Sequence, residues 1–122
     1  MTEKIHILIV DDNRSMAKTL EDILVFEGYV LHTAFSGSEA LKILGSQRVD
    51  ILLTDVRMPD MDGVELYREM RKTHPNLVTF LMTAYAADDI IRAGINEGIK
   101  TVLTKPLDID FLLKLISAVV ST

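Results

Sequence analysis

The sequence contains no cysteine among its 122 residues and no long apolar run. Without cysteine the chain forms neither disulfide bonds nor cysteine-ligated zinc sites, and thiolate catalysis is excluded. The apolar run nearest the N-terminus, Ile5–Val10, is far shorter than the roughly 18 residues of a membrane span. No small-residue cleavage site follows it. We therefore expect a soluble cytoplasmic protein with no membrane contact.

Positive charge is also in short supply. The chain has 13 lysine and arginine residues against 18 aspartate and glutamate residues, for a formal net charge of −5. Because a nucleic-acid groove usually needs a basic stripe, we expect no direct nucleic-acid binding by this chain. The hydrophobic fraction of 48% is enough to fill one core. The length suits one ordinary domain, so we expect a single domain over residues 1–122.

Short apolar runs alternate with longer amphipathic stretches along the whole chain. Several runs are almost continuously apolar, which is typical of parallel strands covered on both faces. The intervals leave room for a helix each time, so we expect a doubly wound five-stranded parallel α/β sheet of order 2-1-3-4-5, flanked by five helices. The predicted strands are Ile5–Val10, Tyr29–Ala34, Ile51–Thr54, Leu77–Met82 and Thr101–Leu103.

Each interval carries helix signals. Gly28 ends the first predicted helix, and Ser36 with Glu39 forms a capping box for the second, which Gly45 ends. The third predicted helix has a cap at Asp62 and a stop at Pro75. The fourth covers about 88–97 and contains Gly94. The last starts at Asp108 and carries an apolar face of Phe111, Leu112, Leu115, Ile116 and Val119.

Reactive side chains stand at the ends of four of the predicted strands. Asp11 and Asp12 follow the first strand and Asp55 follows the third. Thr83 follows the fourth strand and Lys105 the fifth. In such a sheet, ligands bind beyond the carboxyl ends of the strands, where the winding direction switches. We therefore expect three carboxylates, one hydroxyl group and one ammonium group to meet in a single crevice.

This set of groups favours phosphoryl chemistry. Two carboxylates about 4 Å apart repel by roughly 4 kcal/mol at an effective dielectric constant near 20, so three of them in one crevice are unstable unless a cation binds or one of them holds a proton. Oxygen ligands suit Mg²⁺. A carboxylate can attack phosphorus to give an aspartyl-phosphate, while the metal and a lysine neutralise the phosphoryl oxygens. Taken singly, strand-end acids often only cap the next helix, which is the alternative for Asp12 or Asn13.

The motifs at these positions resemble those of response regulator receiver domains over essentially the whole chain. The resemblance implies a flavodoxin-like fold in which Asp55 is the phosphoacceptor. It implies a signalling role in which the chain catalyses only its own phosphorylation and dephosphorylation. The motifs are Asp11-Asp12, the segment DVRMPDMDG at 55–63, Thr83-Ala84 and Lys105-Pro106.

The resemblance also implies a partner and a bound metal. The implied phosphodonor is a sensor histidine kinase or, less selectively, a small phosphodonor. Phosphorylation then alters the face made by the fourth helix, fifth strand and fifth helix. The output domain or protein and phosphorylation-dependent dimerisation stay open, and the Lys105–Pro106 bond is expected to be cis. The resemblance implies that Mg²⁺ is held by Asp11, Asp12, Asp55 and the backbone carbonyl of Arg57. It implies that Lys105 and Thr83 contact the phosphoryl group.

One position departs from the family pattern. Many receivers have an aromatic residue three positions before the lysine, where this chain has Val102. Valine cannot make the inward rotation of an aromatic ring, so the movement of Thr83 must be relayed differently or more weakly. Tyr85, two residues after Thr83, is a candidate substitute or only a loop aromatic.

The main alternative is a phosphohydrolase that also forms an aspartyl-phosphate. Such enzymes usually place a second acid two residues after the nucleophile, where this chain has Arg57, and 122 residues leave no room for a cap domain. The histidines His6, His32 and His74 fall on different predicted elements. We expect them to lie far apart and to form no metal site or phosphohistidine relay.

Overall fold

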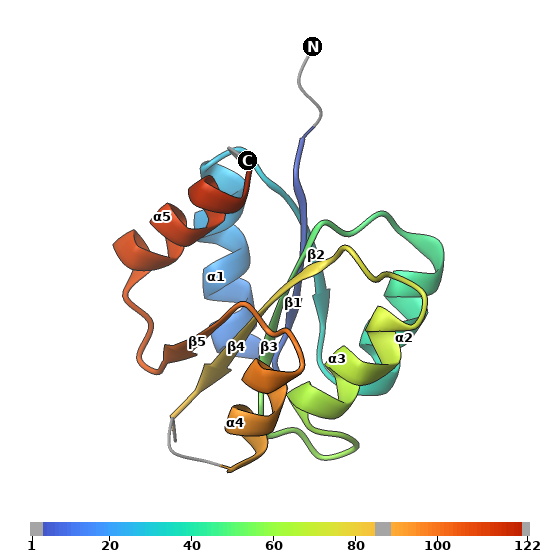
Figure 1. The fold of residues 1–122 in the computed structure, drawn as a ribbon. Helices are drawn as coiled ribbons and strands as arrows, with labels where there is room; N and C mark the ends of the chain where they lie inside the picture. The colour runs from blue at the N-terminus through green and yellow to red at the C-terminus, as the bar shows by residue number, and fades with distance from the viewer. Residues whose placement is uncertain (1–3, 85–88, 121–122) are drawn as a thin grey trace.

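The computed structural model describes residues 4–84 and 89–120, which are built around a sheet of five parallel strands (Figure 1). The strands are paired in the order β2-β1-β3-β4-β5. This is the doubly wound order that the sequence predicts. The strands are β1 His6–Val10, β2 Val30–Ala34, β3 Ile51–Asp55, β4 Val78–Thr83 and β5 Thr101–Thr104.

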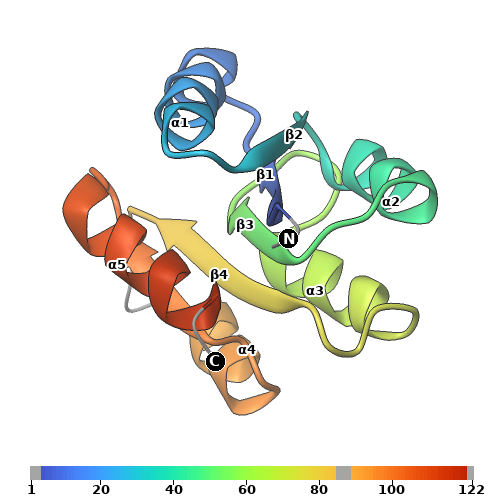
Figure 2. The same cartoon turned by 90° about the horizontal axis from the view of Figure 1, so that it is seen from above.

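Helices cover both faces of the sheet. Helices α1 and α5 lie on one face, and α2, α3 and α4 lie on the other (Figure 2). Burial on both sides explains why the strand sequences are almost continuously apolar. None of these helices is long and apolar enough to cross a membrane. The helices are α1 Arg14–Phe26, α2 Gly37–Ser46, α3 Gly63–Arg71, α4 Asp89–Asn96 and α5 Ile109–Val120.

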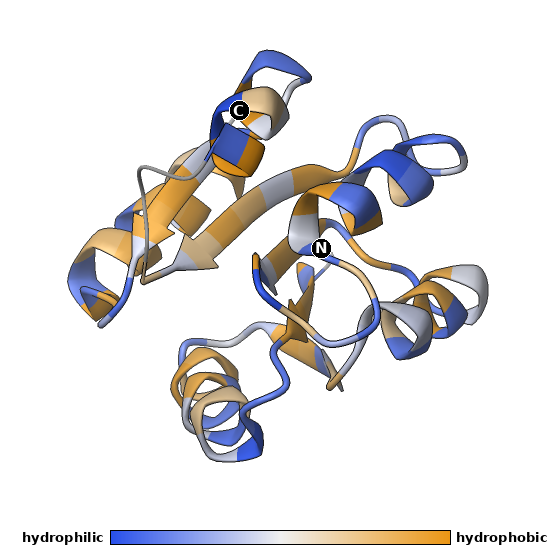
Figure 3. Ribbon diagram, turned by 90° about the horizontal axis from the view of Figure 1, so that it is seen from below, coloured by the Kyte–Doolittle hydropathy of each residue, from blue (hydrophilic) through white to orange (hydrophobic). Residues whose placement is uncertain are grey.

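The sheet separates two hydrophobic cores, because successive side chains of a strand point to opposite faces. In β1, Ile7 and Ile9 belong to the core under α1 and α5, together with Leu20 and Leu112. Leu8 belongs to the core on the other face. The ribbon coloured by hydropathy shows strands that are mostly apolar and helices that are striped (Figure 3). Each fully buried large apolar side chain contributes about 1.5–3 kcal/mol, so the strands are rigid supports for the residues at their ends.

The two predicted helix caps at α2 and α3 are confirmed. Ser36 Oγ accepts a hydrogen bond from the backbone N–H of Glu39 at 3.2 Å. Asp62 Oδ1 accepts from the N–H groups of Val64 and Glu65, both at 2.8 Å. The Glu39 carboxylate accepts from the backbone N–H one residue before Ser36, at 3.4 Å, so the capping box is shifted by one residue.

Two neighbouring polar residues at the N-terminus of α1 have different roles. Asn13 Oδ1 accepts from the backbone N–H of Met16 at 3.1 Å and is the cap. Asp12 is therefore not the cap of α1, and its side chain is exposed. At α5, Asp108 Oδ1 accepts from the backbone N–H of Phe111 at 3.1 Å, as expected for a helix that starts there.

Three local predictions were wrong. Helix α2 continues through Gly45 to Ser46, because the next backbone N–H still bonds to the carbonyl four residues back, at 2.8 Å. Helix α3 ends at Arg71, before the predicted stop at Pro75, and two N–H groups of the following turn share the carbonyl oxygen of Met70. Phe111 is 48% exposed rather than part of the apolar face of α5.

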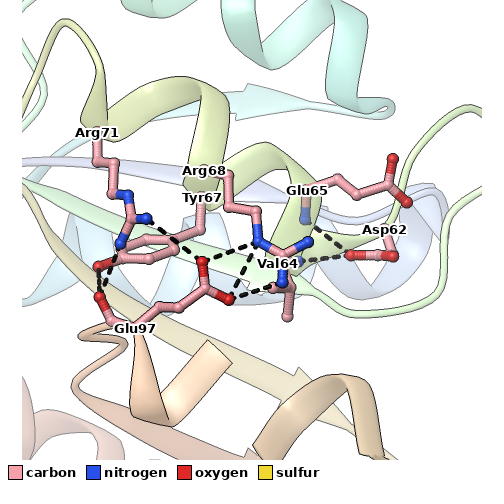
Figure 4. Close-up of polar contacts among 7 residues, drawn as sticks. All are labelled: Asp62, Val64, Glu65, Tyr67, Arg68, Arg71 and Glu97. Atoms are coloured by element: carbon pink, nitrogen blue, oxygen red, sulfur yellow. Dashed lines mark hydrogen bonds and ion pairs between the residues drawn. The ribbon is translucent and has the colours of Figure 1, made fainter. Parts of the chain in front are cut away.

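The C-terminal end of α4 is held to α3 by Glu97 (Figure 4). Arg68 binds the Glu97 carboxylate through two nitrogens, at 2.9 and 2.6 Å. Arg71 and the hydroxyl of Tyr67 donate to the Glu97 backbone carbonyl, at 2.9 and 2.8 Å. A Cβ at Gly94 would lie 3.0 Å from a methyl group of Val64 in α3, so the mid-helix glycine allows α4 to pack closely against α3. Tyr85, the proposed aromatic substitute, lies outside the described residues.

Two of the three histidines lie in contact, so the expectation that they are far apart was wrong for this pair. Nδ1 of His6 in β1 lies 3.0 Å from Nε2 of His32 in β2. The ring centroids are 5.3 Å apart with an angle of 20° between the ring planes. The rings therefore meet end to end, in a geometry that accommodates one shared proton and not two. The carboxylate of Asp50 accepts a hydrogen bond from the backbone N–H of His6 at 2.9 Å and forms an ion pair with Arg48.

This pair predicts a loss of stability in weak acid. Burial lowers the pKa of His32, and a positive charge on His6 lowers it further. As the pH falls below about 6.5, the unfolded chain therefore takes up a proton at this position before the folded chain does, and the stability present above that pH is lost. Thermal unfolding followed by circular dichroism between about pH 7.5 and pH 5.5 measures this loss.

The matched variants are His32→Gln, which should flatten the pH dependence of the melting temperature, and His74→Gln, which should leave it unchanged. His74 lies in the turn after α3, where its Nδ1 is 2.8 Å from the hydroxyl oxygen of Thr73. An equal pH dependence in wild type and His32→Gln would show that the histidine pair does not control acid stability.

Candidate functional site

The three predicted carboxylates come together at the carboxyl edge of the sheet. Asp11 and Asp12 follow β1, and Asp55 is the last residue of β3, the neighbouring strand. One oxygen from each lies within 4.8 Å of the other two, the one group of this kind in residues 4–84 and 89–120. Asp11 is fully buried, Asp55 is 9% exposed and Asp12 is exposed. The cluster therefore has a buried base and an open side.

Lys105 lies between two of these carboxylates. Its Nζ is 3.2 Å from Asp11 Oδ2 and also 3.2 Å from Asp55 Oδ2. The N–H of Lys105 donates to the carbonyl oxygen of Thr83 at 2.8 Å, which holds the Lys105 backbone beside the end of β4. The Lys105–Pro106 peptide bond is cis, as expected. Thr83 ends β4 and is 2% exposed. The strand ends thus bring together the predicted carboxylates and Lys105, and Thr83 ends the strand that lies between β3 and β5.

The loop after Asp55 is closed at its base by backbone contacts. The N–H of Val56 donates to the carbonyl oxygen of Met82 at 3.1 Å, and the N–H of Gly63 donates to the carbonyl oxygen of Val56 at 2.9 Å. A Cβ at Gly63 would lie 2.5 Å from the carbonyl oxygen of Asp55, so this approach requires glycine. Arg57 lies in the loop with an exposed side chain.

The charges of the cluster act strongly on one another. Burial raises the pKa of Asp55, Lys105 opposes this by ion pairing, and the negative charge of Asp11 raises it further, so that the net direction is upward. Burial would lower the pKa of Lys105, but the carboxylates of Asp55 and Asp11 outweigh it and raise the pKa. The single ammonium group of Lys105 therefore does not neutralise the three carboxylates, and the cluster would be stabilised by a further positive charge.

The donor atoms of the cluster fit a hard divalent cation. All three side chains offer carboxylate oxygens, and the cluster includes neither sulfur nor imidazole. Oxygen-only ligand sets favour Mg²⁺, Ca²⁺ or Mn²⁺ over softer metals. The exposed carboxylate of Asp12 leaves the site accessible from solvent. The acidic cluster is therefore able to hold a metal ion.

Sequence reasoning overlooked one residue near this site. Asp60, five residues after Asp55, joins the loop to the N-terminus of α2 through hydrogen bonds to Gly37 and Ser38. The motif makes Asp60 visible in the sequence, but its partners are more than twenty residues away and belong to another helix. No local sequence pattern predicts such a contact.

Comparison with solved structures identifies the class of fold. A CheY-like response regulator receiver domain from Methanospirillum hungatei superimposes with a TM-score of 0.93 at 29% identity, covering 98% of this chain and 95% of that one. Chemotaxis protein CheY4 of Vibrio cholerae gives a TM-score of 0.89 at 28% identity, covering 96% and 99%. The fold is therefore that of the CheY-like receivers.

Sequence comparison assigns the family. The model of the response regulator receiver domain matches residues 7–117, and the chain belongs to this family of two-component signalling phosphoacceptors. It is 44% identical over 108 residues to the response regulator receiver protein Anae109_2439 of Anaeromyxobacter, covering 88% of this chain and 45% of the relative. It is 38% identical over 107 residues to the transcriptional regulatory protein GlrR of Escherichia coli, covering 88% and 24%. The chain spans less than half the length of these relatives.

Proposed function

We propose that Asp55 accepts a phosphoryl group in a reaction that depends on Mg²⁺. The main observation in support of this proposal is the position of Lys105, whose Nζ is 3.2 Å from the carboxylates of both Asp55 and Asp11. In this proposal Asp11, Asp12, Asp55 and the backbone carbonyl of Arg57 hold the metal. When bound, Mg²⁺ supplies positive charge that offsets the negative charge of the transferring phosphoryl oxygens.

The residues of the chain have defined tasks in the transfer from a phosphohistidine. An Asp55 carboxylate oxygen attacks phosphorus, forming a P–O bond as the P–N bond breaks. The electron pair of the P–N bond stays on the imidazole nitrogen of the donor, and the product is a mixed anhydride on Asp55. Lys105 pairs with a phosphoryl oxygen, and the buried hydroxyl of Thr83 donates a hydrogen bond to another.

A sensor histidine kinase is the proposed phosphodonor. Beside the acidic cluster, a groove of about 400 Å³ runs between α1 and the turn after β5. Its lining includes Met16, Leu20 and Leu107, so an apolar helix of the donor can pack there while its phosphohistidine approaches Asp55. The relatives are larger regulators.

In the proposed response, phosphorylation alters the face formed by α4, β5 and α5. Val102 in β5 pairs in register with Leu81 of β4 and packs against the core on the α4 side. A displacement of Thr83 therefore reaches α4 through apolar packing rather than through rotation of an aromatic ring. Glu97 holds the C-terminal end of α4 to α3, which favours movement at the opposite end.

The rival function is an aspartyl-phosphate-forming phosphohydrolase. Fast turnover needs a second acid near the nucleophile to activate water, and Arg57 stands at the position where such enzymes carry it. The acids of the described site are instead engaged with Lys105 or offered to a metal. Slow loss of phosphate from Asp55 is expected, and multiple turnovers on a phosphomonoester would favour the phosphohydrolase.

The direct test uses acetyl phosphate as the phosphodonor. With Mg²⁺ present, the intact protein should gain the mass of one phosphoryl group, and chelation of the metal should prevent this gain. Borohydride reduction of the acyl phosphate followed by peptide mapping should place the label on Asp55. A label on Asp12 or on a histidine would contradict the proposal.

A further inference from the structure

The tip of the loop between β3 and α3 is joined to α2 by one side chain. Asp60 Oδ1 accepts a hydrogen bond from the backbone N–H of Gly37 at 3.1 Å. Asp60 Oδ2 accepts from the backbone N–H and from the hydroxyl of Ser38, both at 2.8 Å. The carboxylate therefore satisfies backbone donors at the start of a helix that belongs to another part of the chain.

This connection is made by a charged group. The N–H and hydroxyl of Ser38, and then the N–H of Gly37, lower the pKa of Asp60 to about 2. Asp60 is therefore ionised throughout the physiological pH range, and its hydrogen bonds are charge-assisted, which makes them stronger than neutral ones. The positive end of the α2 dipole adds to this attraction.

An apolar contact supports the same junction. Next to Asp60, the side chain of Met61 lies against Gly37, where an added Cβ would be 2.6 Å from the Met61 sulfur. At its base, the loop is fixed by the hydrogen bond between Gly63 and Val56. Residues 57–59, which include Arg57, therefore lie between two fixed points.

We propose that Asp60 is a positioning residue for metal binding, because its junction with α2 holds the loop that presents the Arg57 backbone carbonyl to the cation. This inference rests on the proposed function, which makes that carbonyl a metal ligand. A backbone ligand has no side-chain rotamer to adjust, so its position is set entirely by what anchors the loop. Asp60 itself points to α2 and does not touch the metal.

The test is the affinity for Mg²⁺ of the unphosphorylated protein, measured by isothermal titration calorimetry. Loss of a partner that orients a metal ligand typically weakens binding about tenfold or more, so Asp60→Ala should raise the dissociation constant by about this factor. Asp60→Asn keeps a hydrogen-bond acceptor but not the charge, and should lie between wild type and Asp60→Ala.

Ser36→Ala is the matched control. It removes the cap of the same helix, where Ser36 accepts from Glu39, and leaves the Asp60 bonds in place. If Asp60 acts on the metal loop, Ser36→Ala lowers the melting temperature and retains wild-type affinity for Mg²⁺. Equal weakening in Ser36→Ala and Asp60→Ala would overturn the inference, because fraying of α2 alone would then explain it.

Gly37→Ala reaches the same loop without changing Asp60. The new methyl group displaces Met61, and weaker Mg²⁺ binding by this variant would support the inference. Wild-type affinity in both Asp60→Ala and Gly37→Ala, with wild type itself binding Mg²⁺, would overturn it while leaving the proposed function intact. Failure of wild type to bind Mg²⁺ would instead reject the proposed function, so the two failures are distinct.

Discussion

Asp55→Asn is expected to abolish phosphoryl transfer and, in the absence of Mg²⁺, to raise the melting temperature. The amide has no anionic oxygen to attack phosphorus, so transfer stops. Stability should increase because Asp55 is buried beside Asp11, and both effects disfavour its charge in the folded state. The ion pair with Lys105 opposes them without prevailing, since the pKa of Asp55 remains raised.

The sign of this stability effect follows from proton linkage. A carboxyl whose folded-state pKa is raised stabilises the fold below its unfolded pKa and loses that contribution as the pH rises through the folded value. At neutral pH the charged carboxylate of Asp55 therefore lowers the free energy of unfolding, and the neutral amide removes this destabilisation. For a domain of this size, each kcal/mol gained raises the melting temperature by roughly 4 °C.

Mg²⁺ provides the decisive comparison. A ligand that binds only the folded state at about 100 times its dissociation constant adds about 2.7 kcal/mol to stability. Wild type should gain from Mg²⁺, and Asp55→Asn should gain less because it has lost a ligand and a charge. Asp110→Asn, at an exposed position in α5, controls for the change of net charge. Phosphoryl incorporation into Asp55→Asn at the wild-type rate would remove Asp55 as the acceptor.

The parts of the fold and site that sequence predicts are those fixed by local pattern and topology. Continuous apolar runs indicate strands buried on both faces, and alternation with helices dictates the order of the sheet. Once that order is known, the carboxyl ends of β1, β3, β4 and β5 must be neighbours. The convergence of Asp11, Asp55 and Lys105 follows from their positions one or two residues past a predicted strand, without any knowledge of side-chain packing.

The parts that escape prediction depend on contacts between elements. His6 and His32 meet because β1 and β2 are adjacent and the two positions are diagonal neighbours, which requires the exact register. Asp60 meets α2 only because the loop tip folds back against it. Helix α2 passes through Gly45 because hydrogen bonding of the next turn outweighs the roughly 1 kcal/mol cost of a helical glycine.

The opposite change of charge tests the other half of the site. Lys105→Ala removes the cation that lies 3.2 Å from Asp11 and from Asp55. Removing one partner of a buried ion pair leaves charge uncompensated, and with 17% of the Lys105 side chain exposed we expect a loss of about 2 kcal/mol without metal. Thermal or urea unfolding measures this loss, and Lys100→Ala, an exposed lysine before β5, is the control.

Phosphorylation by acetyl phosphate should slow about 100-fold in Lys105→Ala, the typical effect of removing one group that stabilises developing negative charge. Mg²⁺ should now stabilise the protein more than it stabilises wild type, because it supplies the positive charge that the variant lacks.

The stability effects of Lys105→Ala and Asp55→Asn thus have opposite signs. In the double variant, the loss caused by removing Lys105 should shrink, because one of its two carboxylate partners is already neutral. A Lys105→Ala protein as stable as wild type and phosphorylated as fast would show that the lysine neither balances the acids nor assists the transfer.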